Sequence, residues 1–176
     1  MTLETPRLSL IPCEPAHILA LIELPDRFQA LMGYPATVGL REMFTSGEVS
    51  SEWLASLRAL EGTDPWVFGF WIIERASGAA VGSAGFKGPP DGNGAVEIAY
   101  GVAPQFEGRG YASEAAAALV AFAFDADAVR IVLAHTLPTG LASQRVLTKC
   151  GFRHVGEVVD PDDGLVWRWE RLRQET

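Results

Sequence analysis

Hydrophobic and polar residues alternate along several short segments of this chain. Near the N-terminus, Leu8 and Leu10 alternate with Arg7 and Ser9, and a period of two predicts a strand with one buried face. Later segments are rich in β-branched and aromatic residues and are separated by turn-forming residues, which is typical of strands. The pattern predicts strands at residues 7–11, 66–74, 80–86, 95–102, 130–136, 152–158 and 165–169.

Apolar residues recur at helical spacing in the segments between these strands. A helix is predicted at residues 14–23, because Pro15 suits a first helical turn and Pro25 follows directly after the pattern ends. Amphipathic spacing, alanine-rich composition and a closing glycine support further helices. These lie at residues 51–60, 112–124 and 141–150, whereas the pattern at residues 26–47 is less regular and is broken by Gly33, Pro35 and Gly39.

The order of these elements predicts the topology of one sheet. Turn residues join the strands between residues 66 and 102, so we expect an antiparallel meander there. The helix at 112–124 separates strand 95–102 from strand 130–136, and this crossover makes the two strands parallel neighbours. We therefore expect residues 1–176 to form a single α+β domain, with a mixed, mostly antiparallel central sheet and helices on both faces.

Composition and charge narrow the class of protein. A length of 176 residues suits one domain with a substantial core, and a net charge of −8 argues against a general nucleic-acid surface. No apolar run reaches the ~18 residues of a membrane span, and no signal-peptide pattern is present. Cys13 and Cys150 form no CxxC pair, so we expect two free thiols and a cytoplasmic protein. His17 and His154 lack partners at metal-ligand spacing, so no metal site is expected.

A glycine-bearing turn, residues 105–112, lies between an apolar strand and the alanine-rich helix. Such a turn presents main-chain N–H groups and the positive end of a helix dipole, which together bind phosphate. Ser113 stands where a dinucleotide fingerprint needs its third glycine, and no Gly-Lys-Ser/Thr tripeptide occurs. The pattern present is Q-x-x-G-x-G-Y-A, so we expect a phosphate-bearing cofactor of another kind.

This pattern resembles the acyl-CoA pyrophosphate loop of the GNAT N-acetyltransferases. Residues 82–90 and 96–101 resemble the central strands of the ribosomal-protein N-acetyltransferase branch, and residues 134–152 resemble its second CoA-contacting segment. The resemblance covers roughly residues 66 to 170. It implies a GNAT-like sheet whose strands splay at the acyl-CoA site, acetyl-CoA as the cofactor, and direct acetyl transfer to a primary amine.

The resemblance also implies which residues contact the cofactor. The pantetheine arm is expected to pair with the main chain at Val102 and Ala103, as an added strand would. The amides around Gly108 and Gly110 are expected to hold the pyrophosphate, since glycine permits close approach there. The full set of expected cofactor-binding residues is Val102, Ala103, Gln105, Gly108, Arg109, Gly110, Tyr111, Ala112 and Ser143.

Transfer to an amine requires that the amine lose a proton before it attacks. Glu97 is our candidate base, because no other carboxylate occurs in the strand that leads to the turn and its neighbours on that face, Ala99 and Gly101, are small. A structural salt bridge is the alternative for Glu97. Glu114 suits stabilisation of a helix N-terminus, and His135 suits a packed or hydrogen-bonded position better than a proton relay.

The departing thiolate needs a hydrogen-bond donor or acid. Many GNAT enzymes have a tyrosine where this chain has Leu147, so that group is missing. The ribosomal-protein branch has a serine that Ser143 matches, so Ser143 is a candidate for catalysis as well as cofactor binding; helix capping is the equally weighted alternative. Gly140 replaces an asparagine that usually holds the pantetheine amide in that branch.

The identity of the acceptor stays open at this point. A protein N-terminus and a small-molecule amine both agree with the resemblance, and the acidic turn at residues 160–163 suits either attraction of a cation or simple solvation. The alternative functions are a non-catalytic acyl-CoA-binding sensor or scaffold, and a phosphate-ligand domain of another class. Relatives often form homodimers, which makes a homodimer a possible partner state here.

Overall fold

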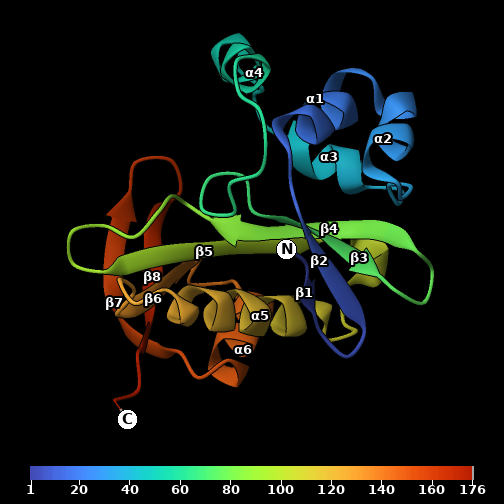
Figure 1. The fold of residues 1–176 in the computed structure, drawn as a ribbon. Helices are drawn as coiled ribbons and strands as arrows, with labels where there is room; N and C mark the ends of the chain where they lie inside the picture. The colour runs from blue at the N-terminus through green and yellow to red at the C-terminus, as the bar shows by residue number, and fades with distance from the viewer. Residues whose placement is uncertain (176) are drawn as a thin grey trace.

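The computed structural model describes residues 1–175, and its framework is a single 8-stranded sheet (Figure 1). The strand order is β1-β2-β3-β4-β5-β6-β8-β7. Every neighbouring pair is antiparallel except β5 and β6, which are parallel, so the predicted mixed α+β sheet is confirmed. The strands are β1 Leu3–Glu4, β2 Leu8–Pro12, β3 Phe70–Glu74, β4 Ala79–Phe86, β5 Ala95–Val102, β6 Ile131–Thr136, β7 Arg153–Asp160 and β8 Gly164–Leu172.

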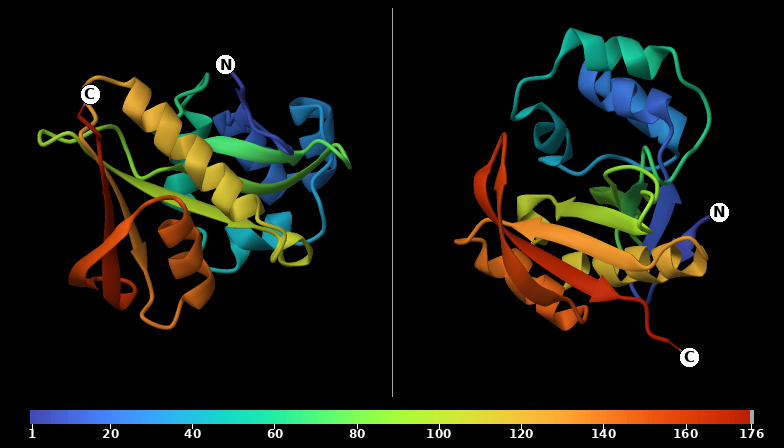
Figure 2. Two further views of the ribbon diagram at one scale, coloured as in Figure 1. Left: turned by 90° about the horizontal axis from the view of Figure 1, so that it is seen from below. Right: turned by 90° about the vertical axis from the view of Figure 1, so that its left-hand side faces the viewer.

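Helices cover both faces of the sheet (Figures 1 and 2). The N-terminal helices form a layer on one face, whereas the helix after the glycine turn and the next one pack on the other face. The first layer contains α1 Pro15–Glu23, α2 Pro25–Met32, α3 Leu40–Thr45 and α4 Ser51–Arg58; the second contains α5 Tyr111–Asp125 and α6 Leu141–Lys149.

The structure differs from the sequence predictions in three places. Residues 26–47 contain the helices α2 and α3, because Pro25 starts a second helix as well as ending the first. Strand β3 begins at Phe70 and not at Trp66, because the N–H groups of Phe68 and Gly69 bond back to Asp64 and Pro65 in a tight turn. The short strand β1 was not predicted, since two residues carry too little pattern.

The sheet separates two hydrophobic cores. Alternate residues of β3 face opposite sides: Phe70 and Ile72 pack towards α5, whereas Trp71 and Ile73 pack towards the N-terminal helices. This strand is therefore buried on both faces. Both cysteines are buried and free. Among residues 1–175, no helix has the length and hydrophobicity that crossing a bilayer requires.

Strands β5 and β6 pair only over a short stretch and then separate. Their register joins Ala95, Val96 and Glu97 to Ile131, Val132 and Leu133. Within the described residues, no pairing continues from there to the ends of the two strands. The sheet therefore opens into a wedge whose narrow end lies at Glu97.

Candidate active site

The wall of this wedge presents main-chain groups of β5. Ala103 N donates to Val81 O at 2.8 Å, and Ala103 O accepts from Phe106 N at 2.9 Å. Because hydrogen bonding alternates along an antiparallel pair, the main-chain groups of Tyr100 and Val102 point away from β4 and towards the wedge. Val102 is thus placed to pair with an extended ligand. The N–H of Ala103 is already bonded and its carbonyl oxygen has one of two acceptor positions in use, and its expected contact with the pantetheine stays a prediction.

The glycine turn presents main-chain N–H groups that have no acceptor. Gly108 and Gly110 have φ angles of 73° and 83°, a left-handed conformation that favours glycine. Within residues 1–175, no hydrogen bond involves the N–H groups from Gly108 to Ser113 as donors. Tyr111 begins α5, so the last of these groups belong to the first turn of a helix, where an anion is stabilised.

Side chains from the link between β1 and β2 hold this turn in place. Arg7 donates from Nη1 to Arg109 O at 2.7 Å and from Nε to Glu114 Oε2 at 2.8 Å. Glu114 also accepts from Thr5 Oγ1 and from Arg7 N, at 2.6 and 2.7 Å. Partial burial alone would raise the pKa of Glu114, but these donors outweigh it and the pKa lies below its usual value. These contacts agree with a structural role for Glu114.

The side chain of Tyr111 fixes the start of α5 from inside the protein. Its hydroxyl donates to the buried carboxylate of Glu74, which lowers the pKa of Glu74 and raises that of Tyr111. The guanidinium of Arg109 lies 3.7 Å from the same carboxylate and 4.9 Å from the centre of the Phe106 ring. The Arg109 side chain therefore packs back onto the protein, and its main-chain amide is the part that the turn presents.

The side chain of Gln105 bonds to the N-terminal layer. Its Nε2 donates to Thr37 Oγ1 at 3.0 Å and to Val38 O at 2.7 Å. These acceptors lie in the loop between α2 and α3. The side chain therefore ties the N-terminal layer to the start of the glycine turn, and the expected contact of Gln105 with the cofactor stays a prediction.

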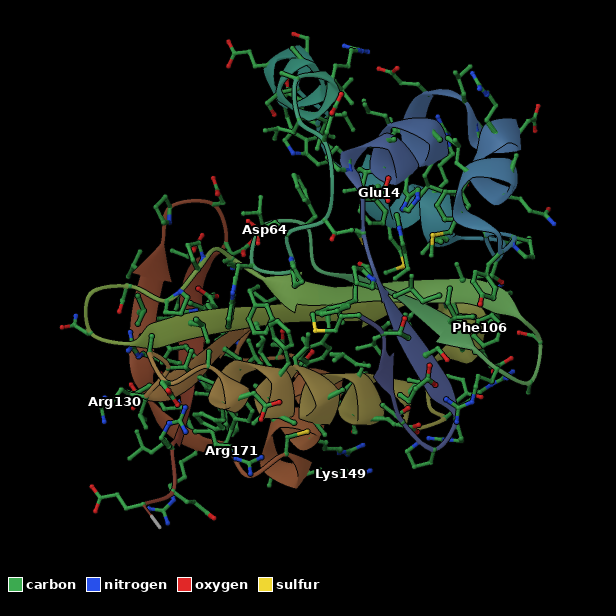
Figure 3. The ribbon with its side chains drawn as sticks, in the orientation of Figure 1. Glu14, Asp64, Phe106, Arg130, Lys149 and Arg171 are labelled. Carbon is green, nitrogen blue, oxygen red and sulfur yellow. The ribbon has the colours of Figure 1, made fainter. Side chains whose placement is uncertain are left out.

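A cleft of about 400 Å³ runs from the glycine turn to the wedge. Ser143 lies in its lining, together with Arg145 and Lys149 of α6, and Figure 3 shows Lys149 on the side of the sheet opposite Glu14. The two basic residues were not predicted as site residues, because exposed cations on a helix carry no distinctive signal. The lining comprises Tyr100, Gly101, Val102, Phe106, Glu107, Gly108, Gly110, Tyr111, Ala112, Ser113, Ala142, Ser143, Arg145, Val146 and Lys149.

Tyr100 is a further cleft residue that the sequence analysis missed. Burial, and to a smaller extent the nearby Cys150, raises the pKa of its phenol strongly, and the neighbouring Ser143 hydroxyl lowers that pKa only slightly. The phenol therefore keeps its proton and remains a donor at neutral pH. Leu147, at the position of the usual tyrosine, is fully buried in the core and does not line the cleft.

Gly140 stands where a side chain would be crowded. A Cβ at this position would lie 3.2 Å from Leu137 O, and Gln144 Nε2 already donates to Leu137 O and Pro138 O at 3.1 Å. The turn before α6 is therefore closed by main-chain and glutamine contacts. An asparagine here would need the turn to shift.

Charged side chains gather at the narrow end of the wedge, on the face that the N-terminal helices cover. Glu97 Oε1 lies 2.8 Å from His135 Nδ1 and 2.9 Å from Lys87 Nζ. Partial burial by itself would raise the pKa of Glu97, but the bonds from His135 and Lys87 and their charge lower it overall. Two main-chain bonds from the turn at residues 160–163 lower the pKa of Asp160, and the nearby Lys87 and His135 lower it further. Among residues 1–175, no cluster suited to a metal ion occurs.

A second, smaller cavity of about 160 Å³ lies on the same face, between the sheet and the N-terminal layer. Ala99 reaches it from β5, two residues after Glu97, and Gly85 reaches it from β4. The cavity has no charged residue in its lining. Its walls are Cys13, Ile18, Phe44, Val67, Phe68, Ser83, Ala84, Gly85, Phe86 and Ala99.

Comparison with known proteins identifies relatives with this architecture. A family model described as "Acetyltransferase (GNAT) domain" matches residues 7–153. The uncharacterized N-acetyltransferase YjdG of Bacillus subtilis is 33% identical over 101 residues, which are 57% of this chain and 58% of that protein. The match thus spans less than two thirds of that relative.

Solved structures share the fold over nearly the full length. A GNAT-family acetyltransferase from Bacillus anthracis superposes with a TM-score of 0.66 at 21% identity, covering 98% of each chain. RimL, a ribosomal L7/L12 alpha-N-protein acetyltransferase solved in complex with coenzyme A, gives a TM-score of 0.68 at 16% identity and covers 98% of each chain. At these identities the likeness establishes the fold alone.

Proposed function

Because the chain belongs to the GNAT acetyltransferase family, we propose that it transfers an acetyl group from acetyl-CoA to a primary amine. The observation that carries this proposal is the row of unbonded N–H groups from Gly108 to Ser113, which opens into a cleft leading to the wedge between β5 and β6. A diphosphate is the kind of group that such a row binds. An extended arm of about the cleft's length would then reach the narrow end of the wedge.

The cleft suits a long anionic thioester in two further respects. Arg145 and Lys149 place positive charge on its wall in a protein whose net charge is −8, so they favour an anionic ligand there. The main-chain groups of Tyr100 and Val102 can pair with the amides of a pantetheine arm. When bound, acetyl-CoA would supply an activated acyl group.

The opposite face of the wedge would receive the amine. Glu97 supplies a carboxylate there, held ionised by Lys87 and His135, so a protonated amine is attracted and its proton has a place to go. Direct transfer is supported by the state of the cysteines. Burial raises the pKa of the Cys13 and Cys150 thiols, so neither is an activated nucleophile for a covalent acyl-enzyme.

Departure of the thiolate calls for donors on the cleft side. Ser143 and Tyr100 present hydroxyl groups to the cleft, and they would donate hydrogen bonds to the arm or to the leaving sulfur. In this arrangement Tyr100, which lies on β5, would donate to the leaving sulfur in place of the helix tyrosine that many GNAT enzymes have at the position of Leu147. The buried Leu147 cannot take part.

The small cavity beside Ala99 suggests the class of acceptor. Its uncharged lining and its volume of about 160 Å³ suit a compact apolar substituent close to the reacting amine. An N-terminal α-amine followed by an apolar first side chain meets this description, and so does a small amine with an aromatic or branched aliphatic group. Polycationic acceptors would leave charges unpaired in the cavity, which is costly.

The test is thiol release from acetyl-CoA with a panel of amines. The panel should contain peptides with apolar or charged first residues, a polyamine and an aminoglycoside. Turnover that favours apolar N-termini supports the proposal in full, and turnover on polycations alone contradicts the acceptor class. Saturable CoA binding with no turnover favours a sensor or scaffold, which the absence of a tyrosine at Leu147 motivates.

Thermal shifts with CoA, ATP and NAD test the ligand class separately. A ligand that binds only the folded state raises the melting temperature, and the increase grows with the logarithm of the ratio of ligand concentration to dissociation constant. Stabilisation by CoA alone agrees with the proposal. Stabilisation by ATP or NAD alone would assign the turn to another class of phosphate ligand.

A further inference from the structure

Glu97 and His135 meet at the last paired rung of β5 and β6. Glu97 stands opposite Leu133 in the parallel register, and His135 lies two residues further along β6 on the same face. Residues two apart in a strand share a face, so both side chains point to the side of the N-terminal helices. The imidazole therefore stands where the wedge opens, on the side proposed for the amine.

The hydrogen bond between these residues determines which ring nitrogen is available. Nδ1 of His135 lies 2.8 Å from Glu97 Oε1. An ionised carboxylate only accepts hydrogen bonds, so Nδ1 carries the hydrogen and, in the neutral ring, Nε2 has a free lone pair. The side chain is 22% exposed, so solvent or a ligand can reach the ring.

We infer that His135 Nε2 is the group that takes up the proton of the acceptor amine, and that Glu97 holds the imidazole in place and stabilises its charged form. This inference rests on the proposed function and reassigns the proton within it. Glu97 thereby becomes a positioning residue, and His135 becomes the catalytic base.

The surroundings of Glu97 make it the poorer base of the two. Both of its donors bond to the same oxygen, and Lys87 compensates its charge directly. A carboxylate whose pKa is depressed has little driving force for taking a proton from an ammonium group. An imidazole is ordinarily a stronger base than a carboxylate, so it has more driving force for taking up the proton of an ammonium group.

Several charged groups lie around the imidazole. Glu97 is hydrogen-bonded to it, Lys87 bonds to the same carboxylate, and the Asp160 carboxylate lies near both Lys87 and His135. Arg168 stands opposite His135 in the β6–β8 register, and its Nε donates to Glu170 Oε1 at 3.0 Å. Lys87 and Arg168 are thus each paired with a carboxylate, Glu97 and Glu170 respectively.

The proposed step balances as follows. The protonated amine transfers one proton to His135 Nε2, and its freed lone pair attacks the carbonyl carbon of the thioester. The new C–N bond forms and the C–S bond breaks, and the second amine proton passes to the leaving sulfur by way of water or the Ser143 hydroxyl. His135 then releases its proton to solvent, so the net products are the amide, free thiol and one proton.

The decisive variant is His135→Asn. An asparagine amide can take the place of Nδ1–H and keep the bond to Glu97, but it provides no base. We expect kcat to fall about 100-fold or more, the KM for the amine and the affinity for CoA to stay within about twofold, and the acid limb of the kcat–pH profile to disappear. Glu97→Gln, which keeps an acceptor for Nδ1, should lower kcat less than His135→Asn does.

The matched control is His154→Asn. His154 is exposed, stacks on Trp167 at 4.3 Å and lies on β7 away from Glu97, so its variant should retain the wild-type rate and pH profile. Nitrogen NMR of the wild type, recorded above the pH at which the ring loses its second proton, should show the remaining ring hydrogen of His135 on Nδ1.

The outcomes separate the two proposals. If the wild type acetylates an amine and His135→Asn is as active as His154→Asn, the role of His135 is refuted while the proposed function stands. If Glu97→Gln abolishes turnover and His135→Asn does not, Glu97 is the base. If the wild type binds CoA but acetylates nothing, the proposed function fails and the assignment of His135 fails with it.

Discussion

Replacement of Gly110 by alanine tests the main-chain cradle most directly. Gly110 has a φ of +83°, and a side chain in this left-handed region costs roughly 1–2 kcal/mol. A Cβ there would also lie 3.1 Å from Arg7 Nη2, so the guanidinium that bonds to Arg109 O must move. Loss of that bond adds about 1 kcal/mol. The total of about 2–3 kcal/mol should lower the melting temperature by roughly 4–12 °C.

The same change should weaken CoA binding. The N–H groups of the turn are aligned by the contacts of Arg7, and a hydrogen bond to a charged group contributes roughly 1.5–3 kcal/mol. Loss of one such bond to a phosphate raises the dissociation constant at least about tenfold. Isothermal titration calorimetry with CoA, together with thermal unfolding, measures both quantities.

Gly78→Ala is the matched control. Gly78 has a φ of +69°, a Cβ added to it would meet no atom within 4 Å, and it lies in the turn between β3 and β4. It should lose about 1–2 kcal/mol from strain alone and keep the CoA affinity of the wild type. If Gly110→Ala binds CoA within twofold of Gly78→Ala, the alignment of these amides does not govern cofactor binding and the reasoning is refuted.

Three further predictions concern separate parts of the site. Glu114→Gln removes the charged acceptor of Thr5 and Arg7 and should destabilise the protein by about 2 kcal/mol at pH 7. Because the pKa of Glu114 is depressed, this stability is present above the unfolded pKa of about 4.3 and is lost as the pH falls through the folded pKa. Melting temperatures of the two proteins should therefore converge in acid, and a gap that stays constant with pH would contradict the assignment. Ala99→Leu should fill the small cavity and raise the KM for the acceptor about tenfold in steady-state assays, while the affinity for CoA stays unchanged. An unaltered KM would place the acceptor elsewhere. Tyr100→Phe removes a donor from the cleft and should lower kcat about tenfold with little change in stability, and a wild-type rate would remove the phenol from the reaction.

The local pattern of hydrophobic and polar residues predicted most of the strands and helices. Alternating residues in β2 and the alanine-rich run of α5 predicted their elements because burial on one face requires that spacing. Local pattern was insufficient at α2 and α3, whose helices are short and depend on contact with the sheet, and at Trp66, whose strand-like composition lies in a turn. The glycine turn was predictable because its main-chain conformation depends on glycines at fixed positions within one short segment.

Side-chain roles at the site could be predicted less well. Gln105 and Ala103 belong to the recognisable motif region, yet their bonds go to Thr37, Val38 and Val81. Tyr100 carried no signal, because its importance comes from facing Ser143 on a helix that lies far along the chain. Such roles depend on which elements pack together.

The sequence by itself determined most of the strands and helices and the position of the glycine turn, because spacing and glycine conformation act within a few residues. The pairing of Glu97 with His135 was decided only by the tertiary structure. The two residues are 38 positions apart, and the parallel register of β5 and β6 alone brings them to one face. A register is set by the packing of both cores together, so no single segment of the chain encodes it.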